Sequence, residues 1–307
     1  MSLSDSRPNA TPRACGVALA DRYPVQSIRF DCEPMRGEVL RSQTTPTNYR
    51  GFASMALLEV KDVEVRFGGI VALSGMTFDI EEGQICGLIG PNGAGKTTMF
   101  NVISRIYDPT VGTLRFNDVD LLKTPPHLIA ETGIFRTFQN LALWPRMSVI
   151  ENVMAGAHVR SKQNFGSAML NVGRKKEEKK LASEAFTILT DLGLANVAFQ
   201  QCAGLPYGTL KRIELARCLI GHPKLLMLDE PATGLTHSEV DELSIVIQKI
   251  RTDYNLTILL VEHHMGLVMS ISENVVVLDF GRKIAEGLPA AVQENPAVIE
   301  AYLGAPA

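Results

Sequence analysis

The pattern of apolar and polar positions changes about fifty residues into the chain. Residues 1–54 are rich in Ser, Pro, Thr, Arg and Asn without a sustained apolar period, whereas apolar residues are dense from Leu57 onward. A segment of the first kind buries too little apolar surface to fold alone. We therefore expect residues 1–54 to be a disordered extension or the result of a mis-called start, with Met55 as the working start; a regulatory arm is the less favoured alternative.

The dense part predicts two kinds of strand. Residues 58–67 alternate loosely, and residues 76–80 and 112–118 read as further half-buried strands. Continuous apolar runs typical of a buried parallel sheet occupy residues 225–228, 257–261 and 275–278. A helical pattern covers residues 238–251, between two of these runs, and this alternation of strand and helix predicts an α/β fold.

The middle of the chain follows a different pattern. Residues 148–221 contain no convincing strand and several helical patterns, of which one covers 177–192 after a charged run at 174–180. The charged run could be a docking surface, but Lys and Glu in this arrangement favour the solvated first turns of a helix.

Composition excludes several classes of protein. The net charge of −3 in 307 residues argues against a nucleic-acid partner, which usually selects a basic excess. The five cysteines are scattered without a C-x-x-C pair, which favours reduced thiols over disulfides or zinc ligands. Since no apolar run is long enough to span a bilayer, we expect any work at a membrane to need a partner that spans it.

A glycine-rich run is the strongest chemical signal. The letters GPNGAGKTT at residues 90–98 follow the apolar segment 85–89 and precede another at 99–103, which is the order of strand, loop and helix that a phosphate loop requires. Backbone N–H groups and the helix dipole attract phosphate oxygens there, while Lys96 reaches the outer phosphates and Thr97 is placed to ligate Mg²⁺. The nucleotide-binding residues expected in this run are Gly90, Asn92, Gly93, Ala94, Gly95, Lys96, Thr97 and Thr98.

Two acids end a later apolar run, LLMLDEP at residues 225–231. Asp229 at such a strand end can hold the Mg²⁺ shell beside a phosphate loop. Glu230 can orient or deprotonate a water that attacks the γ-phosphate. An ordinary acidic turn is the alternative, and the upstream phosphate loop makes it the weaker one.

Together with these motifs, the segment LPYGTLKRIELAR at residues 205–217 resembles the ATP-binding-cassette (ABC) ATPases over roughly residues 57–290. The resemblance implies a P-loop NTPase cassette at 55–290, with a RecA-like core and an antiparallel β subdomain. It also implies a helical subdomain inserted at about 142–221.

The same resemblance implies roles in ATP binding and hydrolysis for individual residues. Gln139 in RTFQN matches the Q-loop residue that contacts Mg²⁺ and water and couples to the transmembrane partner. His263 in VEHH matches the switch histidine, which holds the γ-phosphate and Glu230 in register, and Phe67 in RFGG matches the aromatic under adenine. Two cassettes are expected to close head to tail on two ATP molecules. The signature residues expected to meet the opposed ATP are Leu205, Tyr207 and Gly208.

The signature departs from the common Leu-Ser-Gly-Gly-Gln of the family. Pro206 has neither the serine hydroxyl nor a backbone N–H, and Thr236 stands where the family usually has Asp. We hypothesise that the ATP site completed by this signature is weaker than its twin. An unchanged partner-stimulated turnover in a Pro206→Ser variant would contradict this.

These departures narrow the resemblance to the larger ATPase of bacterial branched-chain amino-acid importers. The long insert at about 158–182 and the ending ENPAVIEAYLG at 294–304, within an expected helical tail at 291–307, agree with it. The resemblance implies ATP and Mg²⁺, permease partners, a second ATPase (a different chain, or a copy of this one) and an external solute-binding protein acting indirectly. It places the chain peripherally at the cytoplasmic face of the cell membrane.

Other readings remain open. A cassette of the same subgroup could serve urea, an aromatic acid or lipopolysaccharide transport. A soluble protein of translation or DNA repair is another alternative, but such proteins usually carry two cassettes in one chain or a long coiled-coil insert. A nucleotide sensor without turnover is a further alternative, but it would not need Glu230, Gln139 and His263 together.

Overall fold

The computed structural model describes residues 56–138, 141–160 and 174–303, with the side chains of 174–176 left aside. The chain separates into two units, residues 1–48 and 49–307, and every described residue lies in the second unit. The expectations for residues 1–54, for Gln139 and for residues 161–173 of the insert therefore lie outside the described residues.

An antiparallel sheet of four strands opens the described chain. Its order is β2 (Ile70–Glu81), β1 (Ala56–Phe67), β4 (Val111–Phe116) and β5 (Val119–Asp120). Val60 of β1 pairs with Phe78 on one side and Leu114 on the other, and all three side chains are buried. Because strand residues alternate between faces, these positions form one apolar face that joins the core.

The second sheet has six strands and holds the centre of the molecule. Its order is β10 (Arg282–Gly287), β9 (Asn274–Asp279), β3 (Ile85–Ile89), β8 (Thr257–Val261), β7 (Leu225–Asp229) and β6 (Ile134–Arg136). All neighbours are parallel except β9 and β10. The predicted buried parallel runs at 225–228, 257–261 and 275–278 are confirmed as parts of β7, β8 and β9, and all their residues are buried. Strand β3 between β8 and β9 is also buried throughout.

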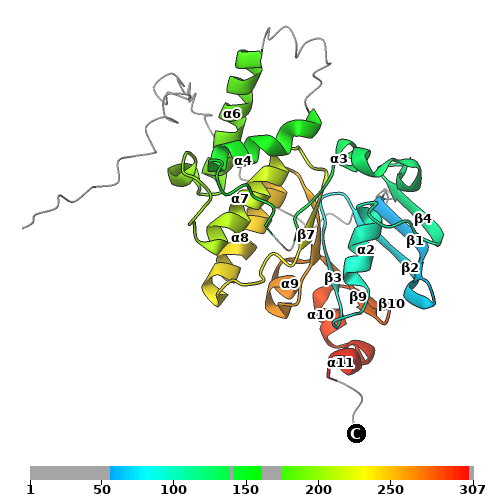
Figure 1. Cartoon of the computed structure of the whole chain (residues 1–307). Helices are drawn as coiled ribbons and strands as arrows, with labels where there is room; N and C mark the ends of the chain where they lie inside the picture. Colours follow the sequence, from blue (N-terminus) through cyan, green and yellow to red (C-terminus); the bar gives the residue numbers. More distant parts are fainter. Residues whose placement is uncertain (1–55, 139–140, 161–173, 304–307) are drawn as a thin grey trace, which may run out of the picture. The chain divides into compact units, whose positions relative to one another are not determined.

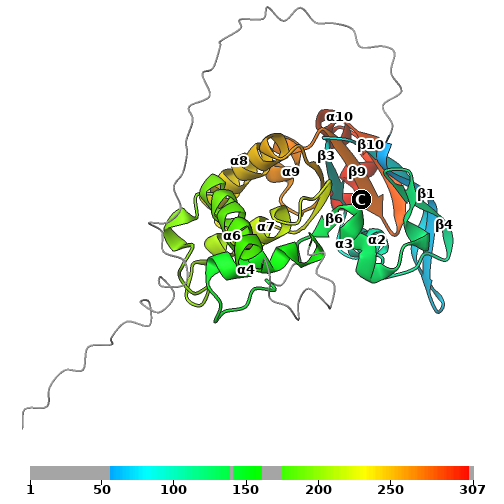
Figure 2. The same cartoon turned by 90° about the horizontal axis from the view of Figure 1, so that it is seen from above.

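Helices connect and cover the sheets. Their bounds are α2 (Lys96–Ile103), α3 (Ile129–Thr132), α4 (Val149–Ala155), α6 (Arg174–Asp191), α7 (Tyr207–Leu219), α8 (His237–Asp253), α9 (Met265–Ile271), α10 (Pro289–Gln293) and α11 (Pro296–Leu303). Helix α4 packs against α6 and α7, and these three helices gather on the side away from β1, β2 and β4 in both views (Figure 1, Figure 2). The helical patterns at 177–192 and 238–251 are confirmed as α6 and α8.

Short 3₁₀ turns complete the list of elements: η2 (Leu121–Lys123), η3 (Pro126–Leu128), η4 (Gly156–Arg160) and η5 (Ala195–Val197). Between residues 148 and 221, the described positions hold helices and turns with one isolated bridge, Ser148 to Gln201, as the helical pattern predicts. In the part of the chain that the structure describes, no helix combines the length and the apolar character needed to cross a bilayer.

The parallel register brings three loops to one edge of the second sheet. Leu88 of β3 and Asp229 of β7 both pair with Val261 of β8, so these strands end together. The chain leaves this edge as the glycine run at 90–95, the acidic turn after Asp229 and the histidine pair at 263–264. The loops at the carboxyl ends of parallel strands are where open α/β sheets bind ligands.

Candidate functional site

The glycine run forms a tight loop between β3 and α2. Gly90 and Gly95 have φ of 151° and 103°, a region that favours glycine. A Cβ on Gly90 would lie 2.1 Å from the Leu278 carbonyl oxygen, and one on Gly95 would lie 2.9 Å from that of Ala72. The loop therefore lies directly against neighbouring backbone at both ends, where only glycine fits.

Lys96 opens α2 and folds back over this loop. The side chain is buried, and its Nζ donates to the carbonyl oxygens of Gly90 at 2.7 Å and Pro91 at 2.8 Å. Burial lowers the pKa of Lys96, and the negative charge of Glu230 opposes that shift. An ammonium held by two carbonyls at the start of a helix can exchange them for phosphate oxygens, which carry more negative charge.

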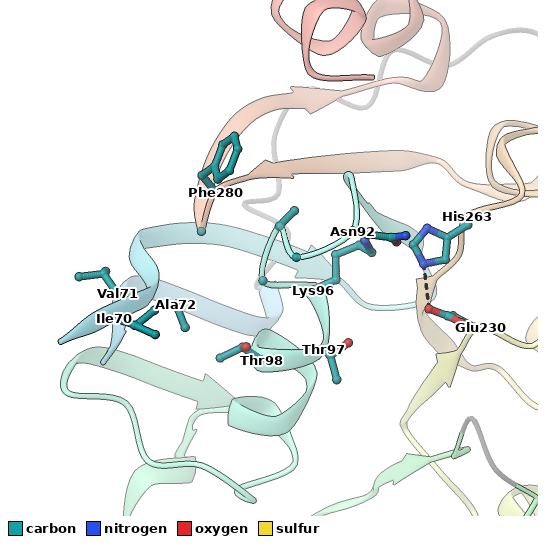
Figure 3. A pocket seen from close by; sticks show the side chains of 14 residues that line it. Ile70, Val71, Ala72, Asn92, Lys96, Thr97, Thr98, Glu230, His263 and Phe280 are labelled. Carbon is teal, nitrogen blue, oxygen red and sulfur yellow. Dashed lines mark hydrogen bonds and ion pairs between the residues drawn. The ribbon is translucent and has the colours of Figure 1, made fainter. Parts of the chain in front are cut away.

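A pocket of about 450 Å³ lies beside the loop (Figure 3). The loop and the start of α2 form one wall, while Glu230 and His263 from the neighbouring loops form another. The lining residues are Ile70, Val71, Ala72, Asn92, Gly93, Ala94, Gly95, Lys96, Thr97, Thr98, Glu230, His263, Phe280 and Gly281. Polar groups thus converge on a concave site, as ligand pockets require.

Glu230 and His263 form a hydrogen-bonded pair at the pocket. His263 Nε2 lies 2.8 Å from Glu230 Oε1, and Thr233 Oγ1 donates to Glu230 Oε2 at 3.3 Å. Glu230 has a positive φ of 47°, and its N–H donates to the Val261 carbonyl at 2.9 Å. A positive φ in a non-glycine residue is strained, and such strain gathers at functional sites.

Buried Glu262 ties the two loops behind this pair. Its carboxylate accepts from the backbone N–H groups of Ala232 and His263. Reasoning from sequence missed this residue; its signal was an acid immediately after a buried strand.

Asp229 turns toward Arg136 in the structure. Arg136 Nη2 lies 2.6 Å from Asp229 Oδ2, both side chains are less than 10% exposed, and Arg136 Nη1 donates to Asn101 Oδ1 at 2.7 Å. Asp229 does not line the described pocket. Arg136 was also missed, although it lies three residues before Gln139 in the RTFQN motif.

Two oxygen-bearing side chains near the loop are of the type that hard divalent cations prefer. The described residues contain no group of three or more His, Cys, Asp or Glu side chains placed to hold a metal ion. The Thr97 hydroxyl lines the pocket, and the Asp229 carboxylate ends the adjacent strand β7. Proteins usually bind Mg²⁺ through only a few of their own oxygens, and substrate phosphates and water supply the remaining ligands.

Phe67 lies outside the described pocket lining. The residue is 46% exposed, and its ring meets the ring of Tyr107 edge to face, with 5.1 Å between the ring centroids. Its hairpin partner Ile70 and the adjacent Val71 line the pocket instead, together with Phe280. The sequence offered one signal for Ile70 and Val71, which follow Phe67 within the same hairpin, and none for Phe280.

The signature residues also lie outside this pocket. Tyr207 begins α7, and Pro206 before it makes no side-chain cap. Leu205 precedes them in the loop, and Gly208 is buried, with Glu239 where a Cβ would point. Among the expected site residues that the structure describes, the pocket brings together Asn92 to Thr98, Glu230 and His263. Those outside its lining are Phe67, Gly90, Leu205, Tyr207, Gly208 and Asp229.

Known proteins resemble the chain over most of its length. A high-affinity branched-chain amino acid transport ATP-binding protein, BraF of Pseudomonas aeruginosa, is 41% identical over 252 residues, which are 82% of this chain and 99% of BraF. LivG of Escherichia coli K12, described in the same words, has the same identity and coverage. A probable LivG of Archaeoglobus fulgidus is 34% identical over 82% of the chain and 96% of its own length.

Solved structures agree with the fold. An ATP-binding cassette of an ABC transporter, MJ1267 in its ADP conformation, has a TM-score of 0.72 and 27% identity over 81% of this chain and 99% of its own. A nucleotide-free cassette from an ABC transporter has a TM-score of 0.71 and 28% identity, with the same coverage. The predicted ABC cassette fold is confirmed.

Two family models match the sequence. The family described as "ABC transporter" matches residues 73–233, and the one described as "Branched-chain amino acid ATP-binding cassette transporter" matches residues 282–307. The chain therefore belongs to the ABC transporter family, as one of its ATP-binding, ATP-hydrolysing subunits.

Proposed function

We propose that this chain is the ATP-hydrolysing motor of an importer for branched-chain amino acids. The observation that carries the motor function is the Glu230–His263 pair, 2.8 Å apart at a pocket walled by the phosphate loop. A protein that only sensed nucleotide would need neither a base nor a histidine that positions it. The family match of residues 282–307 and the names of the relatives BraF and LivG support branched-chain amino acids as the transported solute.

ATP binding uses the loop and the start of α2 in this proposal. Lys96 leaves the carbonyl oxygens of Gly90 and Pro91 for the outer phosphates, while the first amides of α2 face the same oxygens. The adenine end lies toward Ile70 and Val71, with Phe67 at the rim of the same hairpin.

Hydrolysis then depends mostly on positioning, because phosphoryl transfer leaves little covalent work to the protein. Glu230 orients the attacking water and accepts its proton. His263 keeps that carboxylate in place through its Nε2 contact and meets the γ-phosphate. Gln139, outside the described residues, completes the set as the residue that links this site to the membrane partner.

We propose that Thr97, Asp229 and Gln139 help to hold Mg²⁺. Bound there, the ion would neutralise charge on the phosphate oxygens. Arg136 keeps the Asp229 carboxylate oriented at the strand end, with Asn101 fixing the guanidinium in turn.

The proposed assembly contains two cassettes and two permeases at the cytoplasmic face of the membrane. Leu205, Tyr207 and Gly208 lie apart from this chain's own pocket, which suits contact with the ATP of a second cassette. That cassette is a different ATPase or a second copy, and a solute-binding protein acts through the permeases. The cassette domain spans 55–290 in this proposal, with a helical part at about 142–221 and a tail at 291–307.

The test compares ATP hydrolysis by wild type, Glu230→Gln and Glu82→Gln, alone and with the neighbouring permeases in lipid. Glu82 is the matched control, since it is exposed in the turn before β3, at the opposite edge of the sheet. We expect Glu230→Gln to lose about 10²–10⁴-fold in turnover while still binding ATP, and Glu82→Gln to match wild type.

The effect of the permeases on the rate of ATP hydrolysis tests the transport role. Stimulation by permeases and a leucine-loaded binding protein would support an importer motor. ATP hydrolysis that ignores them would sink the transport assignment and leave the ATPase chemistry standing.

A further inference from the structure

The chain between β7 and α8 is a tight turn that carries Glu230 at its start. The Thr233 N–H donates to the Glu230 carbonyl oxygen at 3.2 Å, and the Thr233 hydroxyl donates to the Glu230 carboxylate at 3.3 Å. The Leu235 N–H donates to the Ala232 carbonyl oxygen at 3.1 Å. The position of the Glu230 carboxylate therefore depends on the shape of this segment, the 230–235 turn.

The 230–235 turn is held at two places. After β8, the buried carboxylate of Glu262 accepts from the Ala232 N–H. From α7, the ring of Tyr207 lies directly on the backbone of Gly234, where a Cβ would be 3.1 Å from Tyr207 Cε1 and 3.5 Å from Cδ1. Because packed protein interiors leave little free space, a ring in this place limits how far the turn can move toward α7.

Other contacts fix the ring of Tyr207 and the start of α7 against the start of α8. Buried Lys211, one helical turn after Tyr207, places its Nζ over the ring, 5.5 Å from the ring centroid. The attraction between a cation and an aromatic face favours this orientation of the ring. Gly208 packs just as closely, since a Cβ there would lie 2.9 Å from Glu239 Oε1 and 3.6 Å from Leu235 Cδ2.

The path from Tyr207 to the Glu230 carboxylate is short. The ring contacts Gly234, the adjacent Thr233 donates to one carboxylate oxygen, and His263 contacts the other. Tyr207 itself does not line the nucleotide pocket, so an effect of its ring on this pocket has to pass through the turn. A displacement of about 1 Å in a catalytic group can lower a rate by about 100-fold.

We propose that Tyr207 is a positioning residue for Glu230, whose ring holds the 230–235 turn so that the carboxylate faces the attacking water. The ring does this within its own chain, before a second cassette brings its ATP to the start of α7. This inference rests on the role of Glu230 in the proposed function. It is separate from the contact of Tyr207 with an opposed ATP, which the proposed function also expects.

The first test measures ATP hydrolysis by Tyr207→Leu and Tyr207→Phe beside wild type. Leucine removes the flat ring, so we expect kcat to fall about 10–100-fold. The KM for ATP should stay within about twofold of wild type, because Tyr207 does not line the pocket. Phenylalanine keeps the ring and should restore the kcat of wild type. The matched control is Glu242→Ala, which breaks the exposed ion pair of Glu242 with Arg212 between α8 and α7 and should leave kcat unchanged.

The second test separates positioning within the chain from contact with an opposed ATP. In the nucleotide-free chain no ATP lies between two cassettes, so only contacts within the chain can order the turn. Amide hydrogen exchange of the peptide 230–236 should be about 2–10-fold faster in Tyr207→Leu than in wild type, the range expected for one aromatic contact. The melting temperature should match that of wild type, because Tyr207 is partly exposed and leucine keeps an apolar side chain there.

Three results would overturn the inference alone. They are a wild-type kcat in Tyr207→Leu, an equal loss of kcat in Tyr207→Phe or Glu242→Ala, and wild-type exchange of the peptide 230–236 in Tyr207→Leu. In the last case the loss of kcat would arise only from the contact with the opposed ATP. A Glu230→Gln variant that hydrolyses ATP as fast as wild type would overturn the proposed role of Glu230 and the inference with it.

Discussion

Arg136 fixes the carboxylate of Asp229 behind the nucleotide pocket. The pair is nearly buried, with 9% and 8% of the two side chains exposed, and the guanidinium lies over the rings of Phe100 and Phe138 at 5.3 and 5.5 Å. A buried ion pair adds little net stability, because both charges lose water. Removing one partner is costly, since the other charge then stays buried alone.

Replacing Arg136 with Met should lower the free energy of unfolding by about 3–5 kcal/mol. The control is Arg66→Met, which breaks the exposed pair of Arg66 with Glu64 and should cost about 0–1 kcal/mol. Urea unfolding of both variants measures the two costs. Equal losses of unfolding free energy in the two variants would mean that burial does not determine the cost of breaking the Arg136–Asp229 pair.

At the scale of elements, α8 begins with a capping box. Thr236 Oγ1 accepts from the Glu239 N–H at 3.4 Å, and the Glu239 carboxylate accepts from the Thr236 N–H at 2.8 Å. Thr236 is the residue that stands where the family usually has Asp. Both residue types cap helices well, so the departure keeps the start of α8 intact.

Thr236→Ala should therefore destabilise the protein by about 0.5–2 kcal/mol, while Thr236→Asp should stay near wild type. Thermal or urea unfolding checks both. If the alanine variant were as stable as the aspartate variant, the cap would contribute nothing.

The capping box also has a pH dependence with a definite sign. Its hydrogen bonds from Thr236 hold the pKa of Glu239 below the usual value. A carboxylate with a depressed folded-state pKa stabilises the fold above its unfolded pKa, and the effect fades as pH falls through the folded pKa. The difference in unfolding free energy between Thr236→Ala and wild type should therefore become smaller at acidic pH.

Strands were predictable where burial is complete. The apolar runs inside β7, β8 and β9 were visible because a strand covered on both faces needs apolar side chains on both, which leaves polar residues only at the ends of these strands. Strand β6 escaped detection since it has three residues and ends in Arg136, and β10 did so because its sequence RKIAEG is polar. Strand β2 begins at Ile70, six residues before the predicted start, because pairing with β1 extends it.

The residues of the site also divide into those that could be predicted from the sequence and those that could not. Lys96, Glu230 and His263 were predicted because spaced motifs carry them, and the structure gathers them at one pocket. Arg136 and Glu262 escaped because their roles are contacts between loops distant in sequence. Such contacts depend on the register of parallel strands, which no local pattern encodes.

At the scale of the whole molecule, one chain supplies only part of the proposed site. The described pocket takes its lining from the β1–β2 hairpin, the phosphate loop and the loops after β7, β8 and β9. The first turn of α7, with Tyr207 40% exposed, presents its amides elsewhere. A second cassette that brings such a turn to this pocket would bury those amides against phosphate, as helix starts favour.

We therefore expect ATP to bring two cassettes together as a dimer, and a negative charge at the start of α7 to prevent this dimerisation. With Glu230→Gln to retain ATP, we expect a dimer in analytical ultracentrifugation, formed by the chain alone or with a different cassette. Adding Tyr207→Asp places a carboxylate where the opposed γ-phosphate would lie, and repulsion should return the protein to monomers.

The control for added charge is Thr187→Asp on the exposed face of α6, which should leave the dimer intact. ATP binding by the Tyr207→Asp monomer should equal that of its parent, because Tyr207 does not line its own pocket. A Tyr207→Asp variant that still dimerises with ATP would rule out the start of α7 as the group facing the opposed nucleotide. A variant that loses ATP binding as a monomer would instead mean that α7 contributes to the site of its own chain.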